Sequence, residues 1–384
     1  MYDMIEGTSN DGLLSTGASW RSWGSASNYT DVVFAHVAAR RVHDHVTTHT
    51  TAAGPSAASP MYLHLAFHGP HDDPGVDSGT DEPLLQTAFS SRLGVASKKA
   101  LDALAADEAD NRRRYQFGRS LMATDGAFGQ VVNAMNDSGI LDAGAVIIVA
   151  SDNGAWPCGS RMRGSNAPLR GAKFHYTEGA LRVPGFVYSS GSGAATSLIP
   201  SASRGRAYRG LMHHVDWLTT FASLAGASVD DDPALDSIDQ WQAIVSVDAV
   251  PSPRDEIVFA LSDDYFAIRV GRYKLTLNVL NSTWWGDLDV SKNDSMVCVN
   301  GNAVSELHDV EADPNERRNL FGMDAYAEVQ ANLSSRAREL YKTELYTPSM
   351  PFGSAMADGT NGEAASHAFD SADGYIVSWG CEVQ

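Results

Sequence analysis

Four side chains in this sequence have the types and positions to hold a metal ion together with an anion. Asp152 and Asn153 follow the apolar run Ala145–Ser151. Their carboxylate and amide oxygens suit Ca²⁺ or Mg²⁺ and suit zinc poorly. Lys173 lies on the polar loop that follows, and His71 comes shortly after the apolar string "MYLHLAF". An ammonium or an imidazole can contact a tetrahedral anion or protonate a departing oxygen.

Each of these residues also has a plainer interpretation. Asp-Asn-Gly is a favoured turn string that needs no ligand. Lys173 alone is interpreted as a solvated loop cation, and His71 alone as a turn residue. The functional hypothesis depends on the combination, because metal-binding oxygens, a lysine and a histidine all follow predicted strands.

Hydrophobic periodicity predicts the elements that position these residues. Strand patterns alternate with long helical patterns, which is typical of an α/β protein with a mainly parallel sheet. In such sheets ligands bind beyond the carboxyl ends of the strands. The predicted helices cover residues 28–46, 111–137 and 213–227, and the predicted strands are 61–67, 145–151 and the string "VPGFVYSS".

The pattern changes after residue 250. Three short strands, "EIVFALS", "YFAIRV" and "YKLTLN", follow one another, and Gly271-Arg272 predicts a hairpin between the last two. A helix is predicted near residues 325–343. We therefore expect a catalytic domain over residues 1–250 and a smaller α+β subdomain over residues 251–384.

Composition excludes several classes of protein. Hydrophobic residues make up 43% and charged residues 20% of the 384 positions, as in a packed globular chain. A formal charge of −19 disfavours nucleic acid as a partner. No apolar stretch reaches the roughly 18 residues of a membrane helix, and the first residues lack a signal-peptide pattern. Five N-x-[ST] acceptor patterns favour a secretory history; they begin at Asn28, Asn136, Asn281, Asn293 and Asn332. The three cysteines, Cys158, Cys298 and Cys381, do not define a disulfide framework, and the sequence does not decide whether Cys298 and Cys381 form a bridge.

Several strings together resemble the type I sulfatases, and within them the arylsulfatase B-like branch. They are "YLHLAFHGPHDDP", "SDNG", "GSNAPLRGAKFHYTEGALRVPGFV", "HHVDWLTTFASLAGA" with "SIDQW", "FAIRVGRYKLTL" and "ELHDVEADPNERRNL". The strings occur in the family's order and cover most of the chain, from about Tyr29 to Leu320. The resemblance implies an alkaline-phosphatase-like fold and hydrolysis of a sulfate ester.

By this resemblance, Asp152 and Asn153 are two ligands of a divalent cation, Ca²⁺ or alternatively Mg²⁺. His71 matches the histidine that contacts the sulfate ester near the leaving oxygen. Lys173 matches the lysine of "LRG-x-K", which binds a sulfate oxygen and helps to protonate the leaving group. The implied substrate is a small sulfate ester or a sulfated sugar, and the implied location is a secreted or lysosome-like compartment.

Glu178, Gly179 and Arg182 match the family's "EGG-x-R" segment, with Ala180 in place of the second glycine. We interpret this segment as structural support. The resemblance assigns no role to His68.

The family's nucleophile, a formylglycine made from the cysteine of C-x-P-S-R, has no counterpart in this sequence. Cys158 begins "CGSR", but its arginine stands one position too early and no proline follows the cysteine, so we interpret it as unmodified. We expect the nucleophile and the first two metal ligands to belong to an N-terminal third upstream of Met1. The chain as written is then expected to be inactive and poorly soluble. The Asp-Asp pairs at 72–73, 230–232 and 263–264 fit the missing ligands no better.

Two alternatives to an arylsulfatase-type hydrolase stay open from the sequence. One is a non-catalytic sulfatase relative that binds sulfated glycans or a partner protein. The other is a phosphomonoesterase or phosphoryl transferase of the same superfamily fold, which would need a Ser or Thr nucleophile and zinc-type ligand clusters. The "LRG-x-K" string disfavours the second. The sequence names neither the substrate nor the oligomeric state.

Overall fold

The structure is a computed structural model of the 384-residue chain, in which the chain divides into two compact units. Residues 29–344 form one unit, and residues 1–28 with 345–384 form the other. In the second unit the structure describes two paired antiparallel strands, β1 (Ile5–Thr8) and β2 (Ser19–Ser22). The described residues are 5–8, 19–22, 29–49, 60–71, 99, 108–157, 164–191, 197–227, 235–246, 249–262, 264–281 and 300–343.

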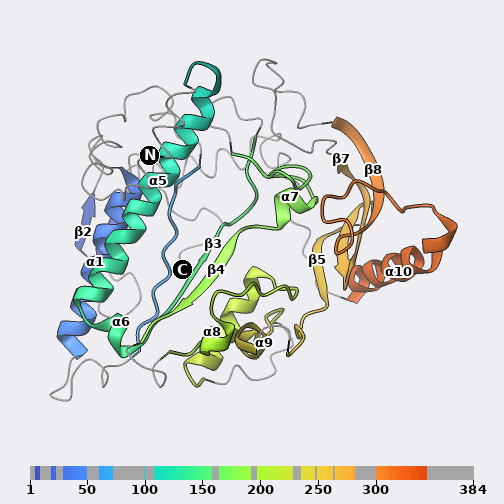
Figure 1. Ribbon diagram of the computed structural model, residues 1–384. Coiled ribbons are helices and arrows are strands. Elements are labelled where there is room, and N and C mark those ends of the chain that lie inside the picture. Colours follow the sequence, from blue (N-terminus) through green and yellow to red (C-terminus); the bar gives the residue numbers. More distant parts are fainter. Residues whose placement is uncertain are drawn as a thin grey trace. The chain divides into compact units, whose positions relative to one another are not determined.

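Two long helices, α1 (Thr30–His49) and α5 (Glu108–Asp137), lie side by side (Figure 1). Their contact is built from small residues: Ala35 and Ala38 of α1 and Ala127 and Val131 of α5 are all buried. Small side chains let the helices approach closely. Leu65 and Phe67 of the segment before His71 also pack against this cluster.

After α5 and the short helix α6 (Ile140–Ala143), the chain enters strand β3 (Val146–Ala150). Its "VIIVA" sequence is rich in β-branched residues, which favour strands. The partner of β3 is β4 (Gly185–Ser189), and the two pair antiparallel from Val146–Ser189 to Ala150–Gly185. The connection between these neighbouring strands, residues 151–184, carries three of the four predicted site residues.

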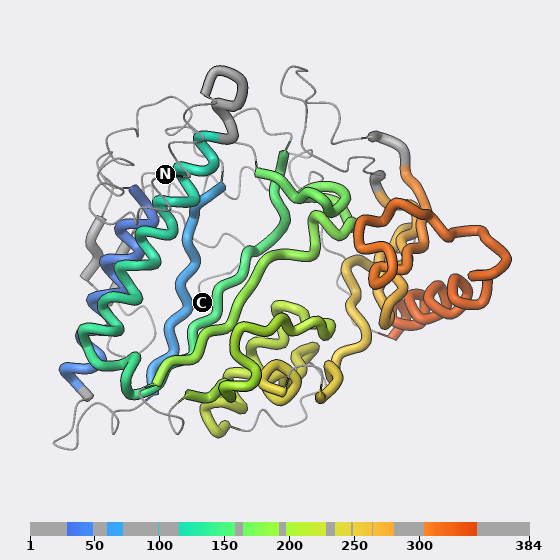
Figure 2. Tube along the Cα trace, in the orientation of Figure 1, coloured from blue at the N-terminus to red at the C-terminus, as the bar shows by residue number. Residues whose placement is uncertain are grey.

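The predicted strand at residues 61–67 is wrong. These residues are irregular in the structure, and Tyr62 and Leu63 are 68% and 39% exposed. Figure 2 shows the segment as an extended stretch of chain. Tyr62 makes an edge-to-face contact with Phe221, with ring centroids 5.4 Å apart. An apolar sequence favours extended backbone here, but no ladder of hydrogen bonds joins it to another described strand.

The predicted helix at 213–227 forms as a 3-10 turn, η3 (His214–Asp216), followed by α8 (Trp217–Leu224). The fully buried carboxylate of Asp216 holds this region together. It accepts hydrogen bonds from the amides of His213 and Ile238, and it pairs with Arg254 at 2.5 Å. Two further short helices are η2 (Ser201–Ser203) and α9 (Trp241–Ser246).

The C-terminal part of the unit is a four-stranded antiparallel sheet in the order β5-β6-β7-β8. Leu275 and Leu307 on the sheet are fully buried against helix α10, which contributes Leu333 and Leu340. The predicted two-residue hairpin turn is confirmed, because Val270 pairs with Tyr273 across Gly271-Arg272. The elements are β5 (Glu256–Leu261), β6 (Phe266–Val270), β7 (Tyr273–Asn281), β8 (Asn300–Asp309), η4 (Asp324–Tyr326) and α10 (Ala327–Thr343).

All strand pairs in the described part of the chain are antiparallel, including β3–β4. The mainly parallel pairing that the alternating pattern predicted is therefore not seen among the described strands. Periodicity predicts which segments are extended, whereas the direction of pairing depends on which segments become neighbours. None of the helices that the structure describes could span a lipid bilayer.

Candidate functional site

The loop after β3 bends at Asp152-Asn153, and the close approach of other backbone at Gly154 requires a glycine there. A Cβ atom at Gly154 would overlap the carbonyl oxygen of Gly179, and one at Gly179 would lie 2.5 Å from the carbonyl oxygen of Arg170. The two glycines therefore let three backbone segments approach closely. The Gly154 amide donates to the carbonyl of Ala180 at 2.8 Å, which joins the "DNG" string to the short helix α7 (Glu178–Leu181).

A second set of hydrogen bonds brings Lys173 back to the same turn. The Lys173 amide donates to the carbonyl of Ala155 at 3.1 Å. Asn166 bridges the two sides, since its Oδ1 accepts from the Ala155 amide at 2.7 Å and its Nδ2 donates to the carbonyl of Gly171 at 2.9 Å. The backbone of Lys173 is thus fixed against Ala155, two residues after Asn153.

The side chains of Asp152 and Asn153 form a small polar turn. Asp152 Oδ1 accepts hydrogen bonds from the amide nitrogen of Asn153, at 2.7 Å, and from its side-chain Nδ2. No described residue donates to the second oxygen of Asp152 or to Oδ1 of Asn153. These two free oxygens, a carboxylate and an amide, are a donor set that fits Ca²⁺ or Mg²⁺. They supply part of a coordination shell, because the described residues contain no cluster of three or more His, Cys, Asp or Glu side chains.

The ammonium of Lys173 forms no ion pair within the described part of the chain. Its Nζ lies 5.5 Å from the centre of the Phe174 ring, and Lys173 is partly exposed. A cation without a carboxylate partner at the edge of a loop is available to hold an anion.

His71 lies at the end of the irregular segment, where α1 anchors the chain. The Asp31 carboxylate accepts from the amides of His68, at 2.8 Å, and Gly69, at 3.2 Å. The His71 amide donates to the carbonyl of His68 at 3.1 Å, which closes a turn, and the two imidazole rings lie 5.6 Å apart. This hydrogen bond and this ring contact do not link His71 to Asp152 or Lys173, so its convergence on the site stays a prediction.

One contact at the end of β3 was missed by sequence reasoning. The Nε2 atom of His214 lies 3.0 Å from the carbonyl oxygen of Ser151, the residue before Asp152. The ring of His214 therefore braces the strand end that presents the metal-binding oxygens. Its string, "HHVDW", pointed to a helix start, and nothing in the pattern indicated that one histidine reaches a strand end.

The turn at Glu178 is held by a buried ion-pair group. Lys274 of β7 contacts Glu178 at 2.8 Å and Glu316 at 2.6 Å, and all three side chains are at most 3% exposed. Glu316 also accepts from the Glu178 amide at 2.8 Å. Burial raises the pKa of the Glu178 carboxyl, but Lys274 outweighs burial and the net pKa is lowered. Burial likewise lowers the pKa of Lys274, and the two glutamates reverse the shift and raise it. This is the supporting role predicted for Glu178.

Arg170 makes a second buried link to the same sheet. Its guanidinium donates to Glu306 at 2.9 Å and lies 3.3 Å from Nε2 of His308, both on β8. Burial raises the pKa of Glu306, and its hydrogen bonds with His308 and Arg170 overcome that effect and lower it. The Lys173 loop is therefore tied to the C-terminal sheet at both ends.

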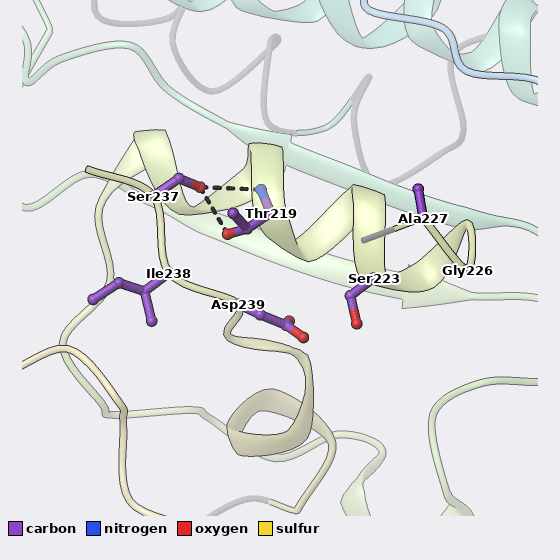
Figure 3. Close-up of a pocket in the computed structure, with 7 residues that line it drawn as sticks. All are labelled: Thr219, Ser223, Gly226, Ala227, Ser237, Ile238 and Asp239. Atoms are coloured by element: carbon purple, nitrogen blue, oxygen red, sulfur yellow. Dashed lines mark hydrogen bonds between the residues drawn. The ribbon is translucent and has the colours of Figure 1, made fainter. Parts of the chain in front are cut away.

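A surface pocket of about 590 Å³ lies between α8, with the two residues Gly226 and Ala227 that follow it, and residues 237–239. Figure 3 shows its polar lining, in which the Thr219 and Ser237 hydroxyls are 2.7 Å apart and Asp239 lies nearby. None of the predicted site residues lines this pocket, so its size alone does not make it the site. Other residues that the sequence singled out lie outside the described part of the chain: Cys158, Cys298, Cys381, Asp72, Asp73, Asp230–Asp232 and Asp263.

Comparison with known proteins bears on the family. A protein-family model described as Sulfatase matches residues 15–227, more than half of the chain. Arylsulfatase J of Mus musculus is 30% identical over 280 residues, which cover 65% of this chain and 44% of that protein. Arylsulfatase A of Homo sapiens is 29% identical over 245 residues, covering 62% of this chain and 45% of that protein. The chain thus spans less than half the length of these relatives.

Comparison with solved structures bears on the fold. The crystal structure of Ps i-CgsB is similar with a TM-score of 0.58 and 18% sequence identity, and the similarity covers 94% of this chain and 64% of that one. At this identity the likeness concerns the fold alone, and it confirms the α/β class expected from the sequence. Together with the family model, these findings show that the chain belongs to the sulfatase family.

Proposed function

We propose that this chain carries the part of a sulfatase active site that binds the sulfate group and protonates the departing oxygen. The observation that supports the proposal is the hydrogen bond from the Lys173 amide to the carbonyl of Ala155, which holds the Lys173 backbone against the turn that carries Asp152 and Asn153. Among the described residues, the Lys173 ammonium forms no ion pair. In this proposal the cation that binds the anion and the oxygens that bind the metal belong to one loop, residues 151–184, between β3 and β4.

In this proposal Asp152 and Asn153 hold Ca²⁺, or alternatively Mg²⁺, which would neutralise charge on the sulfate oxygens. Lys173 binds a non-bridging oxygen and delivers a proton towards the leaving oxygen, and His71 contacts the ester near that oxygen. His214 keeps the strand end in place through Ser151. The sequence contains no C-x-P-S-R motif, so we propose that the chain as written binds sulfate esters without turning them over.

The substrate class that we propose is a sulfated sugar. A protein of the same fold, Ps i-CgsB, has been crystallised in complex with k-i-k-neocarrahexaose. We also propose a secreted or lysosome-like location. Asn136 and Asn332, which begin two of the N-glycosylation acceptor patterns, are exposed, as attachment of a glycan would require.

Calorimetric titration of the full chain with sodium sulfate, with and without CaCl₂, tests the proposal. We expect binding that strengthens with Ca²⁺ and that Lys173→Ala weakens by about tenfold or more, since a charge-assisted contact contributes about 1.5–3 kcal/mol. Lys342→Ala is the matched control, because Lys342 is an exposed lysine on α10.

Loss of affinity in Asp152→Asn only when Ca²⁺ is present would assign the metal to Asp152. Tighter binding of phosphate than of sulfate would favour the phosphoryl-transfer alternative. An effect of Lys173→Ala no larger than about threefold, equal to that of Lys342→Ala, would remove Lys173 from the site.

A further inference from the structure

Next to Lys173 stands an aromatic residue in a costly conformation. Phe174 has a backbone φ of 77°, and its side chain is 67% exposed. A bulky residue rarely adopts the left-handed region, which favours glycine. Such strain persists where the surrounding structure imposes it, and it concentrates at functional sites.

The surroundings of Phe174 do impose this conformation. The Lys173 amide is bound to the carbonyl of Ala155 at 3.1 Å, and the His175 amide is bound to the carbonyl of Ala172 at 3.1 Å. The backbone is therefore fixed on both sides of Phe174, and its ring is left largely in water. Burial of the ring does not compensate for the strain, so the apolar side chain has no evident structural purpose in the described part of the chain.

Phe174 nevertheless has a defined aromatic neighbour. The ring of Trp156 meets it edge to face, with centroids 5.6 Å apart and an interplanar angle of 72°. Trp156 lies four residues after Asp152 on the loop that presents the metal-binding oxygens. The Lys173 ammonium is 5.5 Å from the Phe174 ring centre, so the cation proposed to hold sulfate lies beside a ring that itself contacts Trp156.

We propose that Trp156 and Phe174 form an aromatic wall that packs against the pyranose ring of a sulfated sugar while Lys173 holds its sulfate. The C–H groups on one face of a pyranose are apolar and can pack against aromatic rings. Ligand sites commonly combine such aromatic lining with a few charged groups. The aromatic wall would make the site bind a sugar sulfate more tightly than a small alkyl sulfate or inorganic sulfate. This inference rests on the proposed function and assigns the residues that would contact the sugar ring bearing the sulfate.

The test compares galactose 6-sulfate with methyl sulfate, titrated separately into the full chain in the presence of CaCl₂. We expect the wild-type chain to bind the sugar sulfate more tightly. Phe174→Ala and Trp156→Ala should each reduce that preference by about three- to tenfold, as loss of an aromatic contact implies. Affinity for methyl sulfate should stay unchanged in both variants. Phe174→Tyr should retain the preference, and Tyr188→Ala, which removes a half-exposed aromatic ring from β4, should leave both affinities unchanged.

Thermal unfolding of Phe174→Gly separates a binding role from a structural one. Glycine adopts a positive φ without strain, so this variant should unfold at a higher temperature than the wild type while it loses the preference for the sugar sulfate. A lower unfolding temperature would show that the ring serves packing, against the proposal.

The remaining outcomes separate this inference from the proposed function. If the wild type binds both probes equally, or if the variants weaken both equally, the aromatic wall is refuted and the sulfate site stands. If the wild type binds neither probe, the sulfate site itself is refuted, and the wall with it.

Discussion

Replacement of Lys274 should cost the folded chain a large part of its stability. Its side chain is fully buried between the carboxylates of Glu178 and Glu316, at 2.8 and 2.6 Å. Lys274→Met keeps the aliphatic length and removes the charge, which leaves two buried carboxylates without their counter-ion. Breaking a buried pair in this way costs about 3–5 kcal/mol. Because typical domains are stable by about 5–15 kcal/mol, the variant should lose about a fifth or more of its free energy of unfolding.

Urea-induced unfolding followed by circular dichroism measures this cost, with the slope m showing whether the transition stays comparable. Arg336→Met is the matched control. Arg336 pairs with Glu256 at 2.9 Å, but its side chain is 42% exposed, and exposed pairs contribute about 0–1 kcal/mol.

A second variant separates the ion pair from packing. Combining Lys274→Met with Glu178→Gln and Glu316→Gln removes all three charges and should recover much of the loss, because a neutral group needs no counter-ion. If Lys274→Met costs no more than Arg336→Met, the buried group does not stabilise the loop and the reasoning is refuted.

Two further predictions concern the same loop and its titration. Gly154→Ala should destabilise the chain by about 1–3 kcal/mol, because the added Cβ would overlap the Gly179 carbonyl. Gly129→Ala in α5 is the control, since an added Cβ there meets nothing within 4 Å. In the same urea titration it should stabilise the chain by about 0.5–1 kcal/mol. The folded-state pKa of Glu178 lies below its ordinary value of 4.5, so its contribution is present above pH 4.5 and is lost as pH falls through the folded pKa. The contribution of Lys274, whose pKa is raised above 10.5, is present below pH 10.5 and is lost as pH rises through the folded value. Unfolding free energy measured against pH should therefore fall at both ends in the wild type and fall less steeply at the acid end in Lys274→Met, and an unchanged acid limb would contradict this assignment.

Local patterns in the sequence predicted much of this arrangement. Helical periodicity placed α1, α5 and α10, and the Gly271-Arg272 pair placed the hairpin between β6 and β7. The "DNG" string predicted a turn at a strand end. Its glycine, Gly154, lies so close to the Gly179 carbonyl that no Cβ atom would fit between them.

What the sequence could not predict depends on contacts between distant segments. Residues 61–67 have a strand composition, yet a strand also needs a neighbour to pair with. Lys274 alternates with apolar residues in "YKLTLN", which usually indicates an exposed side chain, but its two glutamate partners lie about 100 and 40 positions away along the chain. The bracing of Ser151 by His214 is equally non-local.

The salt links across residue 250 bear on how this protein could be divided or recombined. Asp216 pairs with Arg254, Glu178 with Lys274, and Arg170 with Glu306. A fragment ending at residue 250 would keep the buried side chains of Asp216, Glu178 and Arg170 but would lose the partners named above, with which they form ion pairs. Replacing the C-terminal sheet with that of another sulfatase would preserve the structure of the Lys173 loop only if the new sheet carried matching charges at the same three positions. A substitution at one of these charged positions is therefore expected to require a compensating substitution at its partner.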